Sequence, residues 1–302
     1  MKGFQMGLLL LISIPLCSKG QTKQMALADL KSLLYSEKEW IKVHVAEFLL
    51  WRNCYVDEVR VEFLKEEEQF GHVPKYRIGI WRVLVQAATD EKNKQYWIDK
   101  IMAAYRNPEG EDRLHAIETL AKLQVGVVQD LPAGLESSFR LYSLWNYALG
   151  SEKKKQIVKN ILIRDLVSNK LTELEMHVTS YILRYIGPLA ENEYVQVKTW
   201  MQTKDLETAL RSNLLATLLI AYPENQPANE QSELKKELFA MFRDAEAIPH
   251  VTMALAQKSD DNDQQIVSDM YKTMRDIKSG NYNSDFHAMT AYMVLKRGED
   301  VK

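Results

Sequence analysis

GEDRLHAIETLAKLQ, residues 110–124, is the stretch of sequence that decides the fold. Its apolar residues recur at intervals of three and four: Leu114, Ile117, Leu120 and Ala121. This spacing is typical of a helix that buries one side. The polar side of the same helix carries Arg113, His115 and Glu118, which are candidate binding or catalytic residues.

The pattern returns along the chain. Residues 40–53, WIKVHVAEFLLWRN, place His44 and Glu47 where the first stretch has His115 and Glu118. Aligned copies share an anchor position at residues 44, 79, 115, 142, 177, 213, 250 and 287, so the intervals are 35, 36, 27, 35, 36, 37 and 37. A period of this length is that of one helical hairpin. The sequence therefore predicts an all-α chain, an α-solenoid of about seven to eight helical hairpins.

Histidines gather in the anchor column. The chain has six histidines, and only His72 falls outside the anchor positions. A random placement would rarely put five of six there, so we expect the column to have a shared structural or functional role.

Partner helices are predicted between the anchor helices, because polar and apolar residues again alternate with helical spacing. The predicted partners span residues 56–70, 92–105, 152–167, 193–203, 230–243 and 263–278. The interval of 27 leaves only residues 125–135 for a partner, so that unit is predicted to be truncated or irregular. No long polar linker divides the chain, and we expect residues 21–302 to form a single repeat domain.

The N-terminal sequence predicts export. Residues 1–20 have one lysine before an apolar run that is shorter than the ~20 residues of a membrane-spanning helix, followed by the small residues Ser18 and Gly20. We interpret residues 1–20 as a signal peptide and expect a mature chain that begins at Gln21, in the periplasm or cell envelope. A lipid anchor on Cys17 is the alternative, which Leu16 disfavours because the residue before a lipidated cysteine is normally small.

The net charge and the apolar runs of the sequence limit the kinds of partner that we expect. The formal net charge is −2, and removal of Lys2 and Lys19 with the signal peptide makes it −4. We therefore expect no general attraction to nucleic acid or to anionic membranes. No second long apolar run follows, so no membrane span is expected in the mature chain. Cys54 would be its one cysteine, and stability must come from the core rather than from a disulfide.

The motif Arg-x-x-Ala-x-x-x-Leu is carried by residues 113–120, and Arg77, Arg140 and Arg211 occupy the same arginine position. This motif resembles the HEAT-like repeats of the PBS-lyase type. The resemblance implies a curved α-solenoid whose second helices line the concave face. The N-terminal segment and the overall style also resemble secreted proteins of Bacteroidota-type bacteria.

Deoxyhypusine hydroxylase is a second helical-repeat family with an instructive resemblance. Its second helices carry His-Glu pairs that point inward and hold two irons, and the anchor column here falls at the second member of such a pair. The resemblance implies that the anchors face the concave side. Adjacent His-Glu dipeptides are missing from this sequence. We therefore expect no di-iron centre.

The candidate working surface lies in the N-terminal third. His44 with Glu47, and His115 with Glu118, are spaced three apart, which puts imidazole and carboxylate on one helical face. Arginine suits an anionic group and tryptophan suits a sugar ring. We predict one concave patch of eight residues: His44, Glu47, Arg77, Trp81, Arg82, Arg113, His115 and Glu118.

Purely structural roles are an alternative explanation for the residues of this patch. A half-buried histidine can hydrogen-bond the neighbouring hairpin, and a glutamate three residues later can pair with an arginine of the next repeat. Two histidines and two glutamates could also hold a metal, but their spacing specifies no ion. We therefore expect neither metal nor cofactor.

Two functions of different classes follow. The favoured one is an exported scaffold or binding protein that uses its concave face for a protein partner or a glycan. The alternative is a periplasmic enzyme on a saccharide-like anionic substrate, with Glu47 and Glu118 as acid and base, His44 and His115 beside them, and Arg77 or Arg82 on the anion.

Overall fold

A computed structural model describes residues 18–133, 137–223, 228–277 and 281–296. Within these ranges the chain has fifteen α-helices, one short 3-10 helix and no strand. The prediction of an all-α fold is confirmed. Most of the predicted signal peptide, residues 1–17, lies outside the described residues, while residues 18–20 belong to the first turn of helix α1.

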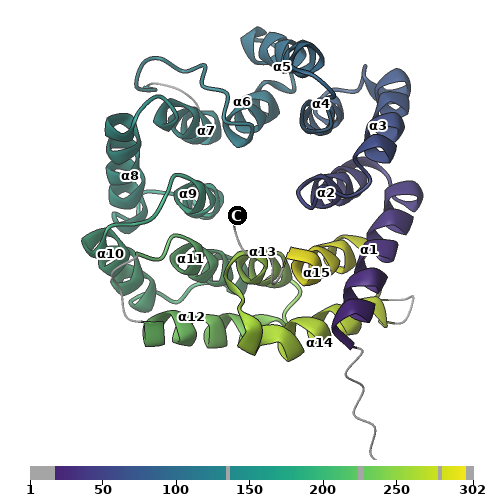
Figure 1. Ribbon diagram of the computed structural model, residues 1–302. Helices are drawn as coiled ribbons and strands as arrows, with labels where there is room; N and C mark the ends of the chain where they lie inside the picture. Colours follow the sequence, from purple (N-terminus) through teal and green to yellow (C-terminus); the bar gives the residue numbers. More distant parts are fainter. Residues whose placement is uncertain (1–17, 134–136, 224–227, 278–280, 297–302) are drawn as a thin grey trace, which may run out of the picture.

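The α-helices form two concentric layers (Figure 1). The inner layer comprises α2 (Glu39–Leu50), α4 (Tyr76–Gln86), α6 (Arg113–Lys122), α7 (Ser137–Ala148), α9 (Glu173–Tyr185), α11 (Thr208–Ile220), α13 (Ile248–Lys258) and α15 (Ser284–Lys296). The outer layer comprises α1 (Ser18–Ser36), α3 (Val56–Phe70), α5 (Glu91–Arg106), α8 (Glu152–Val167), α10 (Glu191–Gln202), α12 (Ala228–Met241) and α14 (Gln264–Arg275), which the 3-10 helix Asp261–Asp263 precedes. Each anchor position lies on an inner helix.

The array of hairpins closes into a ring. Helix α15 packs against both α1 and α2, so the last hairpin meets the first (Figure 1). Asp29 of α1 accepts a hydrogen bond from the Tyr271 hydroxyl at 2.5 Å, and its carboxylate lies 2.9 Å from His287 Nε2. Phe48 of α2 stacks on Tyr292 of α15 with ring centroids 4.8 Å apart. The described helices therefore form a closed array, and the predicted α-solenoid of seven to eight hairpins is not confirmed.

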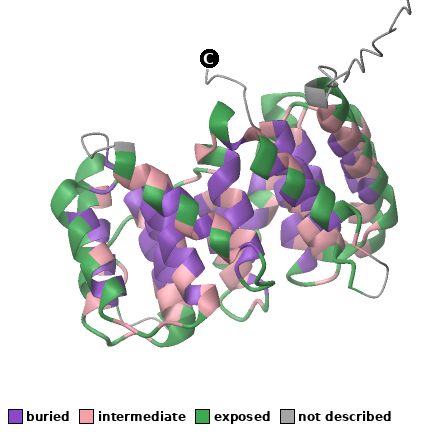
Figure 2. Ribbon diagram, turned by 90° about the horizontal axis from the view of Figure 1, so that it is seen from below, coloured by how far each residue is buried: buried purple, intermediate pink, exposed green. Residues whose placement is uncertain are grey.

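Burial explains the two layers. The outer helix α14 buries residues at positions i, i+3, i+4 and i+7: Val267, Met270, Tyr271 and Met274. Inner helices have neighbours on several sides, and α11 buries nine of its thirteen residues. Figure 2 shows the same contrast, with exposed residues concentrated on the outward sides of the helices. A stripe of apolar residues is enough for the outer layer, whereas the inner layer needs helices that are apolar over most of their surface.

The predicted irregular unit lies between α6 and α7, which pack directly against each other. The described residues between them, 123–133, contain no helix. The backbone of this segment forms hydrogen bonds with the side chain of Asn146 instead of with a partner helix. Its Oδ1 accepts from the backbone N–H groups of Val127 at 2.7 Å and Val128 at 3.0 Å, and its Nδ2 donates to the Val125 carbonyl at 2.8 Å. Buried backbone groups need such partners, so the irregular segment is fixed by one side chain.

Gly79 sets the distance between α2 and α4. A Cβ atom at this position would lie 3.0 Å from the Trp40 ring and 3.0 Å from a methyl carbon of Val43. Glycine therefore lets these two inner helices approach more closely than any larger residue would, which helps the ring to curve.

Candidate functional site

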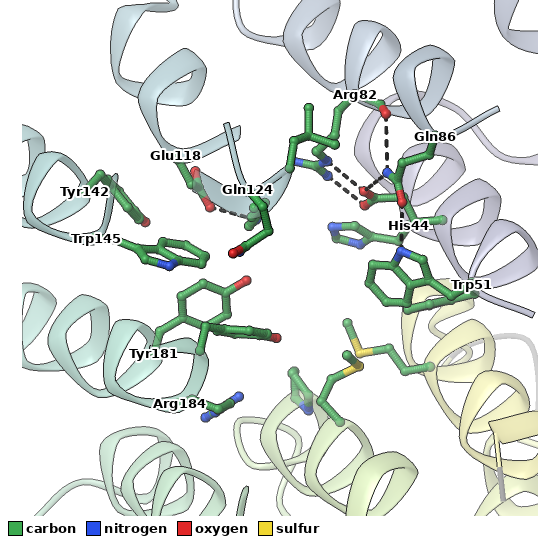
Figure 3. A pocket seen from close by; sticks show the side chains of 18 of the residues that line it. His44, Trp51, Arg82, Gln86, Glu118, Gln124, Tyr142, Trp145, Tyr181 and Arg184 are labelled. Carbon is green, nitrogen blue, oxygen red and sulfur yellow. Dashed lines mark hydrogen bonds and ion pairs between the residues drawn. The ribbon is translucent and has the colours of Figure 1, made fainter. Parts of the chain in front are cut away.

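A cavity of about 440 Å³ lies at the centre of the ring. It is lined by side chains from seven of the eight inner helices, and Figure 3 shows how they converge. The lining residues include His44, Glu47, Phe48, Trp51, Arg82, Gln86, Glu118, Lys122, Gln124, Tyr142, Trp145, Tyr181, Arg184, Tyr185, His250, Met253 and Met289. Segments that are far apart in sequence therefore meet in one space because the ring is closed.

A buried ion pair forms one wall of the cavity. The Arg82 guanidinium donates from Nε to Glu47 Oε1 and from Nη2 to Oε2, each at 2.7 Å. Gln86 Nε2 donates to Glu47 Oε1 at 2.9 Å, and Trp51 Nε1 donates to Gln86 Oε1 at 2.8 Å. Burial alone would raise the pKa of Glu47, but the guanidinium of Arg82 and its hydrogen bonds hold that pKa below its ordinary value. Glu47 is therefore a buried carboxylate that is ionised at neutral pH and accepts three hydrogen bonds.

A second ion pair lies across the cavity on α6. Lys122 Nζ is 2.7 Å from Glu118 Oε1, one turn apart on the helix. Burial opposes the charge of Glu118, yet Lys122 and Arg82 hold its pKa below the ordinary value. The nearby Tyr142 hydroxyl has a raised pKa because it is buried and close to the Glu118 carboxylate. This tyrosine stays protonated and can donate a hydrogen bond.

Aromatic rings form the wall opposite the first ion pair. Trp145 stacks on Tyr185 with centroids 5.5 Å apart, and Tyr181 meets Tyr185 at 4.8 Å. Trp145 is buried, and among the described residues its Nε1 has no hydrogen-bond partner. Burial and the nearby Glu118 carboxylate raise the pKa of Tyr181 to about 12. The wall thus offers flat apolar faces together with a protonated hydroxyl donor.

Arg184 reaches the cavity from the last turn of α9 (Figure 3). Its Nη2 donates to the backbone carbonyl of Asn213 at 3.1 Å and to the Asn213 side-chain oxygen at 2.6 Å. Its Nε lies 3.4 Å from the Thr217 hydroxyl, a long contact. Beside it, burial and the charge of Arg184 lower the pKa of His250 to about 3, so this imidazole is neutral.

His44, the other histidine that lines the cavity, contacts helix α15 where the ring closes. His44 Nδ1 lies 2.9 Å from Asp285 Oδ1, which joins α2 to α15. Its partner is therefore not Glu47, the residue three positions later on the same helix.

The structure divides the predicted eight-residue patch. Four of its members line the central cavity: His44, Glu47, Arg82 and Glu118. The other four are not among the lining residues: Arg77, Trp81, Arg113 and His115. The predicted alternative, a glutamate that pairs with an arginine of the next repeat, describes the contact between Glu47 and Arg82.

The four residues outside the cavity contact neighbouring helices. Arg77 Nε binds Asp112 at 2.6 Å, and Trp81 Nε1 donates to Glu67 at 2.6 Å. Arg113 donates to the Tyr105 carbonyl at 3.1 Å and covers the Phe139 ring, and His115 stacks on Trp40 at 5.8 Å. These four side chains therefore join neighbouring helices to each other.

Sequence reasoning missed most of the cavity, since the predicted patch contains four of its nineteen lining residues, although the repeat register contained a signal. Trp51, Gln86, Lys122 and Arg184 each follow an anchor position by seven residues. Seven residues are close to two helical turns, so these side chains lie on the same face as their anchors, nearer the C-terminal end. These four lining residues thus lie about two turns closer to the C-terminal ends of their helices than the anchor positions do.

Comparisons of the chain with protein-family models, with curated proteins and with solved structures gave no match. Within the ranges that the structure describes, no group of three or more His, Cys, Asp or Glu is placed to hold a metal ion. No described helix has the length and apolarity that crossing a membrane requires.

Proposed function

We propose that the protein is a binding protein whose central cavity holds a small molecule with a hydroxylated ring, such as a mono- or disaccharide unit. The observation that carries the proposal is the convergence of aromatic faces and fixed polar groups from seven inner helices on one cavity. A volume of about 440 Å³ falls within the range of small-molecule sites, ~300–1,000 Å³.

The side chains suit a sugar better than a purely apolar ligand. Trp51 and Tyr185 line the cavity and are partly exposed, so they offer ring faces on which the C–H groups of a sugar pack. Protonated tyrosine hydroxyls supply donors for hydroxyl oxygens. Glutamates that are held in ion pairs supply acceptors at fixed positions, which gives orientation without a large reorganisation on binding.

A glycan or sugar is favoured over the protein partner that the repeat pattern also predicts. An open concave face can lie along a protein surface, but a closed ring admits only what fits its centre. The likeness to HEAT-type repeats, whose partners lie along the concave face, therefore gives less guidance here than the cavity itself.

The enzymatic alternative needs a carboxyl group that holds a proton near neutral pH. A glycosidic general acid has a raised pKa, whereas both Glu47 and Glu118 have lowered ones. Both oxygens of Glu47 already accept hydrogen bonds from Arg82. These properties favour binding over catalysis by these two residues.

Binding is tested by isothermal titration calorimetry with a panel of neutral and acidic mono- and disaccharides. Trp51 is 44% exposed and lines the cavity, so Trp51→Ala should leave the fold intact and weaken sugar binding about tenfold, the loss of ~1.4 kcal/mol of stacking. Tyr96→Ala is the matched control, since Tyr96 is 54% exposed on the outer helix α5. Equal affinity of the Trp51 and Tyr96 variants would contradict the proposal, and cleavage of a disaccharide by the wild-type protein would favour the enzyme.

We further propose that the protein works outside the cytoplasm, as the sequence of residues 1–20 predicts. Mass spectrometry of the expressed protein should find a chain that begins at Gln21. A diacylated Cys17 at the N-terminus would instead show a lipoprotein.

A further inference from the structure

The charged side chains of the central cavity are paired, with one exception. Each of the two lining carboxylates pairs with a cation, Glu47 with Arg82 and Glu118 with Lys122, and His44 contacts Asp285 of the neighbouring helix. Arg184 has no aspartate or glutamate at ion-pair distance among the described residues. The cavity therefore has one positive charge that no carboxylate of the described chain neutralises.

The surroundings of Arg184 hold the guanidinium without neutralising it. Its side chain is buried, with 5% of the residue exposed. The oxygens of Asn213 accept from Nη2 and the hydroxyl of Thr217 accepts from Nε, and no residue in the described part of the chain is a hydrogen-bond partner of Nη1. Burial lowers the pKa of Arg184, which reflects the cost of holding a charge away from water. A buried ion without a counterion is costly in a protein interior, and an anionic ligand would remove that cost.

The groups around Arg184 add donors and no competing charge. His250 is neutral, so it does not share the role of cation. The hydroxyl of Tyr181 stays protonated, and Tyr181 lines the same cavity. Figure 3 shows Arg184 and Tyr181 bordering the same open space. A cation with a hydroxyl donor beside it is complementary to an anion with several oxygen acceptors.

We propose that Arg184 binds the acidic group of the ligand, so that the sugar unit in the cavity is an acidic one that carries a carboxylate, as uronic acids do. This inference rests on the proposed function, because it names the class of sugar that the same cavity takes. It also reassigns the anion-binding role from Arg77 and Arg82, which already hold Asp112 and Glu47.

The wild-type protein provides the first test. Calorimetry compares glucuronate and galacturonate with their uronamides, which replace the carboxylate by a neutral amide of similar shape, and with glucose and galactose. We expect at least one uronate to bind tenfold or more tightly than both its amide and its neutral sugar, because a charge-assisted hydrogen bond to a buried cation is stronger than a neutral one.

Variants of Arg184 provide the second test. Arg184→Met should weaken uronate binding roughly 10- to 100-fold and weaken binding of the neutral sugar by a smaller factor, so that the ratio of the two affinities falls. Arg184→Lys keeps the charge and should retain part of the preference. Arg140→Met is the control, since Arg140 also lies on an inner helix but faces Asp165 rather than the cavity. If Arg184→Met does not fold, the uronate-to-uronamide ratio of the wild-type protein decides.

The outcomes separate this inference from the proposed function. Uronates and neutral sugars that bind equally would overturn the role of Arg184 and leave the sugar site standing. If no sugar binds, the proposed function fails, and acetate and benzoate become the probes. An anion that raises the urea midpoint of the wild-type protein but not of Arg184→Met would then support an anion site alone. No effect of either anion would overturn it.

Discussion

The replacement Glu47→Gln tests whether the central ion pair holds the ring together. Glu47 is 6% exposed, and its carboxylate accepts three hydrogen bonds, two from Arg82 and one from Gln86. Glutamine has the same shape, but its amide nitrogen would face the N–H groups of Arg82 and leave that cation buried without a counterion. Removal of one partner from a buried pair costs about 3–5 kcal/mol, and we expect Glu47→Gln to lose that much free energy of unfolding.

Glu118→Gln is the internal comparison. Its pair with Lys122 joins side chains that are 20% and 28% exposed, so solvent weakens the attraction and a loss of less than about 1 kcal/mol is expected. Urea unfolding at pH 7, followed by far-ultraviolet circular dichroism, measures both variants, with equal slopes required for the comparison. The reasoning is refuted if the two variants lose the same free energy, or if Glu47→Gln is within 1 kcal/mol of the wild-type protein.

The pH dependence gives a second check on the same pair. The pKa of Glu47 is lower in the folded protein than its ordinary value, which is about 4.3 in an unfolded chain. Its charge therefore stabilises the fold above about pH 4.3, and that stability is lost as the pH falls through the folded pKa. The difference in unfolding free energy between wild type and Glu47→Gln should be constant from pH 7 to 5 and shrink below pH 4. A difference that stays constant to pH 3 would contradict the ion-pair origin of the effect.

Three further predictions concern other parts of the ring. Gly79→Ala should destabilise the protein in urea, because the crowding of its Cβ against Trp40 costs about 1–3 kcal/mol, more than the ~1 kcal/mol gained in helix propensity; a stabilised variant would show that α2 and α4 can move apart. His250 should titrate near pH 3 by NMR, and a midpoint near 6.5 would place it in open solvent. Asp29→Asn should weaken the ring closure by about 1–3 kcal/mol because His287 and Tyr271 lose a charged acceptor, and an unchanged urea midpoint would argue against it.

Much of the layout of helices follows from the local pattern. Residues 56–70 and 152–167 are helices with the predicted bounds, since apolar spacing and polar breaks fix them within the segment itself. The short interval between anchors 115 and 142 likewise predicts the irregular unit before α7. In these places local sequence and final structure agree, and no distant residue needs to be known.

The closed ring could not be predicted in the same way. Closure depends on the angle that each hairpin adds, and small residues such as Gly79 change that angle through contacts between helices. The contacts that complete the ring, for example between Asp29 and His287, join residues 258 positions apart. A repeat pattern specifies that neighbours stack, but it does not specify that the last helix reaches the first.

The repeat register does not predict which way a side chain points. His44 and His115 occupy the same register position, yet His44 lines the cavity and His115 stacks on Trp40. Helix α6 adjoins the unit without a partner helix and packs directly on α7. Equivalent positions therefore have different surroundings, and one residue of a column does not predict the role of another.

Arg82 and Arg184 show how the surroundings of a residue determine its role in binding. Arg82 and Arg184 both follow an anchor by a whole number of helical turns or nearly so, both line the cavity and both are 5% exposed. The sequence predicts Arg77 or Arg82 as the anion-binding group because both lie between two His-Glu pairs, but Asp112 and Glu47 already neutralise them. Arg184 is flanked by Asn213 and Thr217, which orient the guanidinium and leave its charge available. Which arginine can bind a ligand is thus decided by what stands opposite it on the neighbouring inner helix, whereas the closure of the ring decides that both arginines line one cavity.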